Sequence, residues 1–321
     1  MPRPRAAETD ANAAPARDAH HVRGLLWGLL AAAIWATYTV LARLGIKAGL
    51  SPLDLTLLRF LPGALLMAPL VARWGWRDLA HIGWRRGLAL AVLAGPGFSL
   101  LFMTGFSLAP LAHGAVIAPA CQMLGSLAFS AWLANQPLTR ESVIGAGFVL
   151  VGLACMGGDS LLHGEGGLTL AGDALFAAAG LCWGAFGALS RRWRVDPLRV
   201  TGVVAVVSLV LYAPVYATFA DIGRLAAAGA AMLSMQLLAQ GVGAGLVAML
   251  AFSRAVALLG PGRAGFFGAL VPGAASVLAI PVLGEVPTPL QVAGIAAVVV
   301  GLLLAFGAAR YLIARPEGGA P

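Results

Sequence analysis

Few polar side chains interrupt the long apolar stretches of this 321-residue chain, and those few are its candidates for ligand chemistry. Arg59 lies within an apolar stretch, where a charge is costly unless it faces a cavity or a partner. Its guanidinium could anchor a ligand carboxylate or phosphate, or it could bond backbone carbonyls. Gln236 and Gln240, one helical turn apart, and Gln122 carry amides that donate and accept hydrogen bonds. Such amides suit an uncharged or zwitterionic ligand, and they equally suit hydrogen bonds between helices.

Two aromatic pairs share a spacing of three residues. Trp35 pairs with Tyr38, and Trp183 pairs with Phe186, so in a helix each pair presents both rings on one face. The rings could stack on a planar or aromatic ligand, or they could pack in a hydrophobic core. Both pairs are therefore candidates for ligand binding, with core packing as the alternative.

Ser99 and Met103 share one face of a further apolar stretch and complete the candidate binding set. They follow Gly95-Pro96-Gly97, which should break or bend the helix because proline lacks a backbone N–H donor. His113 is expected near the end of the next stretch, where it could take up and release a proton as part of the function or be incidental.

The composition indicates which elements position these residues. Hydrophobic residues make up 60% of the chain and charged residues only 11%, whereas soluble domains carry about 25% charged residues. Most side chains must therefore face lipid or other apolar helices, and stretches of about 20 apolar residues predict spanning helices. We expect an all-α integral membrane protein with ten transmembrane helices, near residues 24–44, 53–72, 87–108, 111–133, 141–158, 171–190, 198–219, 232–252, 264–284 and 288–308.

The basic residues predict the orientation of these helices. Of the 21 Lys and Arg residues, only Arg43, Lys47 and Arg224 fall on the side opposite the N-terminus, and Arg59 falls within a span. Basic residues are concentrated in cytoplasmic connectors of membrane proteins. The distribution therefore predicts that both termini are cytoplasmic. It also explains the net charge of +8 without a nucleic-acid partner.

The sequence gives little support for catalysis. Cys121, Cys155 and Cys182 lie apart inside apolar stretches, as small hydrophobic residues of packed helices do. No pair of carboxylates, His cluster or Ser/His/Asp set falls at one membrane level. We therefore expect no catalytic residue, no metal and no cofactor.

An internal repeat divides the chain into two halves. With a shift of 148, residues 35–43 align with 183–191, and with a shift of 149, residues 139–153 align with 288–302. Each half then holds five spans, an odd number, so the second half must enter the membrane from the opposite side. Inverted repeats of this kind are typical of secondary transporters. The predicted parts are a disordered cytoplasmic tail, a first repeat, a second repeat and a cytoplasmic tail, at residues 1–22, 23–158, 171–308 and 309–321.

Motifs in both halves resemble those of the drug/metabolite transporter superfamily of the EamA type. The motifs are the Trp35, Tyr38 and Arg43 pattern, Ser51-Pro52 followed by Leu58-Arg59-Phe60, and Leu283-Gly284-Glu285 followed by Thr288. The resemblance covers about residues 24–308. It implies ten helices, cytoplasmic termini and export of small metabolites such as amino acids, nucleosides or drugs from a central cavity. One departure is that the first repeat has Asn135-Gln136 in place of Gly284-Glu285, so a role for an acidic residue there does not carry over.

These observations predict a secondary transporter of the bacterial inner membrane that exports a small, amino-acid-like metabolite by alternating access. A drug or nucleoside/purine exporter of the same fold is the first alternative, and a membrane-embedded enzyme acting on lipid is the alternative from another class. Asp54, Asp173 and Glu285 are all expected at helix ends, so facilitated export or exchange is favoured over proton coupling. The expected partners are the small-molecule substrate and the lipid bilayer. Gly241-x-x-x-Gly245 fits a homodimer contact, and it equally fits packing within one chain.

Overall fold

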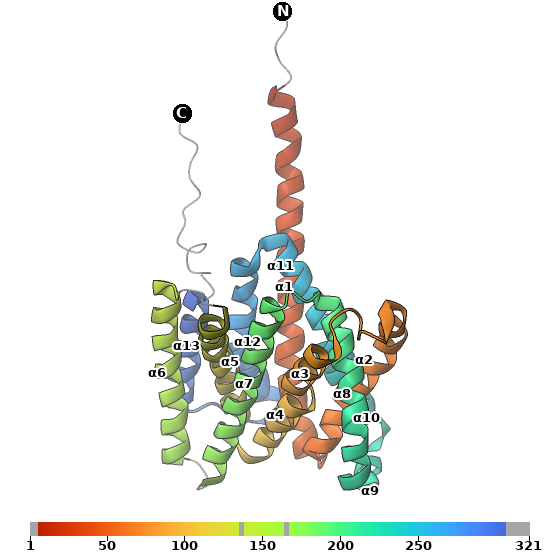
Figure 1. The fold of residues 1–321 in the computed structure, drawn as a ribbon. Helices are drawn as coiled ribbons and strands as arrows, with labels where there is room; N and C mark the ends of the chain where they lie inside the picture. The colour runs from red at the N-terminus through yellow and green to blue at the C-terminus, as the bar shows by residue number, and fades with distance from the viewer. Residues whose placement is uncertain (1–5, 135–137, 164–166, 306–321) are drawn as a thin grey trace, which may run out of the picture.

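The computed structural model describes residues 6–134, 138–163 and 167–305, and every long segment of these ranges is helical. The helices form one bundle in which successive spans run in opposite directions (Figure 1). The helices, in chain order, are α1 (Ala6–Lys47), α2 (Pro52–Gly75), α3 (Trp84–Ala94), α4 (Pro96–Leu108), α5 (Leu111–Ala134), α6 (Arg140–His163), α7 (Gly167–Arg192), α8 (Pro197–Phe219), α9 (Ile222–Ala227), α10 (Gly229–Gln236), the π-helix η1 (Leu237–Val247), α11 (Ala248–Leu259), α12 (Pro261–Leu283) and α13 (Pro289–Ala305).

Within the described residues, nine helical segments of at least 21 residues are apolar enough to cross a membrane, and α13 is a shorter apolar helix of 17 residues. The all-α class and the ten spans are therefore confirmed. The first helix differs from expectation at its start, because α1 begins at Ala6. Residues 6–22 were expected to be disordered, but their alanines favour continuation of the following apolar helix. The predicted tail at 309–321 lies outside the described residues.

The two repeats pack as an inverted pair. In the first repeat, α1 contacts α11, η1 and α12 of the second repeat. The corresponding helix of the second repeat, α7, contacts α3, α4 and α5 of the first. Helices that correspond to each other also pack together, α2 with α8, α5 with α12 and α6 with α13. The contacts of α1 and α7 correspond when the repeats are exchanged, as do those of α2 with η1 and of α3 with α8, so the packing has the two-fold character that the sequence repeat predicts.

Glycines allow α6 and α13 to cross at close range. A Cβ on Gly145 would lie 2.5 Å from the carbonyl oxygen of Gly301, and one on Gly152 would lie 2.8 Å from that of Gly294. Any side chain at these positions would therefore push the two backbones apart. Small residues at helix crossings let membrane helices approach closely and pack by van der Waals contact.

The third helix of each repeat is irregular at the same position. In the first repeat, Gly95 separates α3 from α4, and Pro96 supplies no N–H to continue the helix. A shift of 148 places Gly95 over Gly243, which lies inside η1. π-helical segments are rare and frequent at functional sites. The predicted break after residue 94 is thus present, and its counterpart in the second repeat is a π-helix that the sequence did not indicate.

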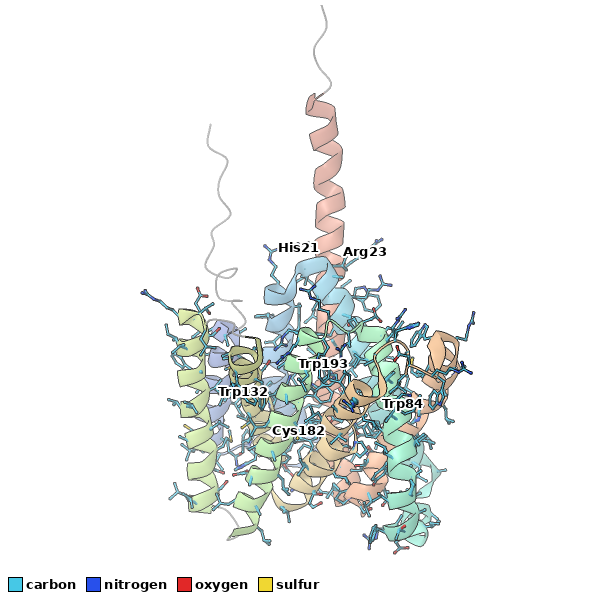
Figure 2. All side chains as sticks on the ribbon, in the orientation of Figure 1. His21, Arg23, Trp84, Trp132, Cys182 and Trp193 are labelled. Carbon is cyan, nitrogen blue, oxygen red and sulfur yellow. The ribbon has the colours of Figure 1, made fainter. Side chains whose placement is uncertain are left out.

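The bundle has two opposite ends, the N-terminal face and the distal face. The N-terminal face is the end at which α2 and α7 finish, and it carries His21 and Arg23, with Trp193 below them (Figure 2). The distal face is the opposite end, where α1 finishes and α13 begins.

Candidate functional site

Arg59 is a buried charged residue of α2. The start of this helix is fixed by Ser51, whose hydroxyl accepts from the backbone N–H of Asp54 while the Asp54 carboxylate accepts from Ser51 in return. Arg59 lies a little more than one turn after Asp54, and it is 9% exposed. Its guanidinium carbon lies 5.0 Å from the ring centroid of Tyr38 and 5.6 Å from that of Phe98. Both distances permit cation–π attraction.

The guanidinium of Arg59 is only partly satisfied by the protein. Its Nη1 atom is buried and has no hydrogen-bond partner in the part of the chain that the structure describes, and neither does the hydroxyl of Tyr38. Buried polar groups are almost always paired, so an unpaired one indicates strain or an absent ligand. These two atoms provide one donor nitrogen and one hydroxyl for a bound molecule.

Aromatic rings from both repeats continue from Arg59. Phe98 lies 4.7 Å from Trp183, and Trp183 lies 5.3 Å from Phe186, measured between ring centroids. We call Tyr38, Arg59, Phe98, Trp183 and Phe186 the central site. Trp35 does not join it, and its ring centroid lies 5.3 Å from that of Phe252 of α11 instead.

A cavity of about 50 Å³ opens beside the central site. Arg59, Trp183 and Phe186 line it, together with Gly241 and Gly245 of η1. One water occupies about 30 Å³ of liquid, so this space holds a water or two and no metabolite. The cavity beside the central site is therefore too small for a metabolite in this structure.

Gln236 and Gln240 lie outside the central site, and both are fully buried. Gln240 donates to the Oε1 of Gln236 at 3.0 Å, and Gln236 donates to the carbonyl of Leu41 at 2.7 Å. These bonds join the irregular helix of the second repeat to α1. Of the acceptors of these two side chains, the Oε1 of Gln240 has no partner among the described residues.

The remaining candidates make contacts between helices. Ser99 lies 3.0 Å from the hydroxyl of Thr56, and Met103 is fully buried in the core. Gln122 is half-buried on α5, where its backbone lies against Gly180 of α7. None of the three predicted residues borders the described cavity beside Arg59.

A larger cavity of about 460 Å³ lies at the distal face between the repeats. His113 of α5 lines this cavity. Its place in the sequence predicted an interfacial position, but the side chain is fully buried. Its Nδ1 lies 2.8 Å from the carboxylate of Asp173, and its Nε2 lies 3.3 Å from that of Asp159. A buried imidazole is thus held between two carboxylates from α6 and α7.

The expectation that no buried acid is available was wrong. Asp159 is 3% exposed, although it lies only one turn before the end of α6. The predicted span stopped at residue 158, after Gly157-Gly158, whereas the helix continues to His163. Leu161 and Leu162 beyond Asp159 were the available signal that the span was longer.

Polar residues at the start of α13 complete this cluster. Thr288 donates to one oxygen of Asp159 at 2.5 Å, and Gln291 donates to the other at 2.6 Å. The Nε2 of Gln291 also lies 3.1 Å from the Nε2 of His113. We call His113, Asp159, Asp173 and Gln291 the distal site. Two of its members come from each repeat.

A charged contact lies at the edge of the same cavity. Glu285, between α12 and α13, lies 3.0 Å from the Nε of Arg43 and 2.8 Å from the Nζ of Lys47. It also accepts from the backbone N–H of Leu111 at 2.8 Å. Burial favours a raised Glu285 pKa, but the bonds from Lys47, Leu111 and Arg43 outweigh it and hold this pKa below its ordinary value. We call Arg43, Lys47 and Glu285 the distal latch.

The opposite face has a different arrangement. Arg191, which aligns with Arg43, donates to the hydroxyls of Ser126 and Ser130 at 2.8 and 2.9 Å. Gln136, which aligns with Glu285, lies outside the described residues. The residues that align with the charged distal pair are therefore an arginine bonded to hydroxyls and a neutral glutamine. Among the described residues, no group of three or more His, Cys, Asp or Glu side chains could hold a metal ion.

Comparisons with known proteins agree with the fold. Fifteen chains of solved structures match the fold. One of them, titled "Crystal structure of protein", is 20% identical, has a TM-score of 0.62, and matches over 89% of this chain and 98% of its own. A search of curated proteins found no significant match. The model of the EamA-like transporter family matches residues 22–158 and 170–307, which are the two repeats. The chain therefore belongs to the EamA-like transporter family, and it is a membrane transporter built from two inverted five-helix repeats.

Proposed function

We propose that this transporter exports a small amino-acid-like metabolite by alternating access through the central site. The observation that carries the proposal is the buried Arg59, whose Nη1 lacks a partner among the described residues and whose guanidinium lies over two aromatic rings. The N-terminal face is the cytoplasmic side in this proposal, because most basic residues lie at that end.

The charge of Arg59 favours an anionic group on the substrate. No carboxylate of the described residues forms an ion pair with it. A buried charge without a counter-charge is strongly unfavourable, so a substrate carboxylate would stabilise the guanidinium by providing the negative charge. The fork of guanidinium donors matches a carboxylate in a bidentate geometry. A nucleoside lacks this group and a cationic drug would be repelled, which is why both rank below an amino acid.

The aromatic rings suit the rest of such a molecule. Phe98, Trp183 and Phe186 offer apolar faces next to the guanidinium. An amino acid with an aromatic or branched apolar side chain could place that side chain among the rings while its carboxylate meets Arg59. We therefore take phenylalanine as the first substrate to test.

The interrupted helices support alternating access. The break at Gly95 and the π-helix η1 flank the central site at corresponding positions of the two repeats. Discontinuous helices at matching positions of inverted repeats are the best pointer to a transporter binding site. Rocking of one repeat against the other would enlarge the closed cavity of about 50 Å³ towards one face at a time.

Counterflow of tritiated phenylalanine in proteoliposomes tests the proposal. Arg59→Gln removes the charge and should weaken binding by about 2 kcal/mol or more, which is about thirtyfold in affinity. Arg77→Gln is the matched control, because Arg77 is exposed at the N-terminal face. Normal counterflow in Arg59→Gln, with folded protein by size-exclusion chromatography, would contradict the assignment.

Competition identifies the chemical group that Arg59 binds. Phenylalanine and 3-phenylpropanoate should compete with the labelled substrate, whereas phenethylamine, which lacks the carboxylate, should not. Counterflow of tritiated uridine or adenosine together with no counterflow of tritiated phenylalanine would favour the nucleoside alternative instead.

A further inference from the structure

We propose that the distal site, His113 with Asp159, Asp173 and Gln291, binds one proton and couples the pH difference across the membrane to transport. The inference rests on the proposed function and adds a second ligand, the proton, at a place separate from the central site. It replaces the expectation of uncoupled export, which assumed that no buried acid is present.

The first step of the argument is the hydrogen count of His113. Both ring nitrogens face carboxylate oxygens, Nδ1 towards Asp173 at 2.8 Å and Nε2 towards Asp159 at 3.3 Å. A protonated imidazole has two N–H groups and satisfies both carboxylates. A neutral imidazole has one N–H group and leaves the other nitrogen as an acceptor. The protonated form therefore fits the two carboxylates.

Gln291 makes the neutral form fit as well. Its Oε1 accepts from the backbone N–H of Thr288 at 3.2 Å, which turns its Nε2 towards Asp159 and His113. One hydrogen of the amide can donate to Asp159 at 2.6 Å, and the other can donate to the His113 Nε2 at 3.1 Å. The neutral ring then donates from Nδ1 to Asp173 and accepts at Nε2. Both ring nitrogens and both carboxylates thus have partners in two states that differ by one proton on Nε2.

The second step is the exchange between these states. When the proton is on Nε2, that nitrogen donates to Asp159 and can no longer accept from Gln291. When the proton leaves, Gln291 regains its acceptor. Because Gln291 belongs to the second repeat and His113 to the first, the proton changes a bond between the two halves of the transporter.

The third step is the route from this bond to the rim of the cavity. Gln291 and Thr288 cap α13, and Glu285 precedes that cap by three residues. On the other side, Leu111 lies two residues before His113 and donates its backbone N–H to Glu285. The distal site is therefore connected to Glu285 of the distal latch in two ways, through the start of α13 and through the backbone N–H of Leu111. A change in proton load acts at the contact that holds the distal face closed.

The charged surroundings favour proton binding over other cations. The charged groups that face His113 are Asp159 of α6 and Asp173 of α7. The uncharged groups there are the amide of Gln291 and the hydroxyl of Ser160, which lies 3.3 Å from His113 Nδ1 and donates to Asp173. Glu285 and Arg43 line the same cavity, and Lys47 pairs with Glu285. With His113 neutral, the two aspartates give the site a charge of about minus two, and in a low-dielectric region a proton relieves part of this charge. The cavity of about 460 Å³ gives water access to the cluster.

The first experiment needs no substrate. The full-length protein, labelled with ¹⁵N in its histidine rings, is placed in lipid bilayers and studied by solid-state NMR, with His113→Gln identifying the His113 signals. We expect a neutral ring protonated at Nδ1 in alkaline solution and a doubly protonated ring in acid. A ring that keeps one form from about pH 5 to 9, the range in which histidines titrate, would overturn the proposal.

The second experiment measures coupling with tritiated phenylalanine in proteoliposomes. A gradient of about one pH unit supports about tenfold accumulation when one proton moves per substrate. The wild type should approach this value, whereas His113→Gln should show no accumulation yet retain counterflow at equal pH. His21→Gln, the same change at an exposed position of α1, should behave as the wild type. Accumulation that persists in His113→Gln would refute the coupling.

A second variant separates proton binding from folding. Asp159→Asn keeps the imidazole and places an amide N–H where the carboxylate oxygen faces His113 Nε2, so the ring should remain neutral. This variant should also lose accumulation and retain counterflow, and its NMR signals should stay in the Nδ1-protonated form. Counterflow without gradient-driven accumulation in the wild type would refute the coupling while leaving the proposed function intact. Absence of any phenylalanine counterflow would refute the proposed substrate, and the NMR titration would still decide the proton site.

Discussion

Replacing Glu285 by Gln should open the distal face. Glu285 is contacted by Arg43, Lys47 and the N–H of Leu111, and its side chain is 20% exposed. Breaking a fully buried pair is worth about 3–5 kcal/mol, and an exposed pair is worth about 0–1 kcal/mol. Because the group is partly exposed, we expect an intermediate loss of about 1–2 kcal/mol.

This loss acts on the equilibrium between closed and open forms of the distal face. A change of about 1–2 kcal/mol shifts such an equilibrium about fivefold to thirtyfold towards the open form. The amide oxygen that the Glu285→Gln substitution introduces can still accept from the N–H of Leu111, so the effect should be on the two cations and not on the fold. The latch therefore sets how often the distal cavity opens.

Distances between spin labels measure the shift. Labels on cysteines at Ala48 and Val282, in a variant without the native cysteines, lie on opposite sides of the latch at exposed positions. Glu285→Gln should add a population at longer distance. Asp221→Asn is the matched control, since Asp221 is an exposed distal residue 4.0 Å from its cation, and it should leave the distribution unchanged. An identical distribution in Glu285→Gln and wild type would refute the latch.

Two further predictions concern stability. Glu285 has a lowered pKa in the folded protein, so its charged form stabilises the fold above its unfolded pKa of about 4.3, and this contribution is lost as the pH falls through the lower folded value. The difference in melting temperature between wild type and Glu285→Gln should be constant near neutral pH and vanish in acid; a difference that grows in acid would reverse the sign. At the crossing of α6 and α13, Gly301→Leu should destabilise by about 1–3 kcal/mol through overpacking, because even a Cβ would lie 2.6 Å from the carbonyl of Gly145. Gly147→Leu on α6 meets nothing within 4 Å and should be nearly neutral in the same thermal unfolding assay; equal losses in both variants would contradict close packing as the cause.

The elements of the central site were predictable to different degrees. A charge in an apolar stretch indicated Arg59, and spacing indicated the pair of Trp183 and Phe186. Phe98 carried no such signal, because one phenylalanine in an apolar helix resembles any other. Its place between Arg59 and Trp183 depends on how α4 crosses α7, which no local pattern encodes.

The distal site shows a different kind of failure. His113 and Asp173 were visible in the sequence, but they were judged by their distance from helix ends. Burial was decided by the packing of α5, α6, α7 and α13 around them, which removes water even within one turn of a helix end. Asp159 was missed because two glycines ended the predicted span, although a helix that packs along one face against α13 can continue through glycine.

By itself, the sequence determined the membrane location, the number of spans and the inverted duplication, because each depends on hydropathy, charge or self-similarity along one segment. Only the tertiary structure decided which polar groups meet: Arg59 with rings from both repeats, and His113 between two carboxylates and an amide. The physical reason is that hydropathy is a property of consecutive residues. A buried polar network, in contrast, is a property of helix faces brought together by the close contacts of distant segments.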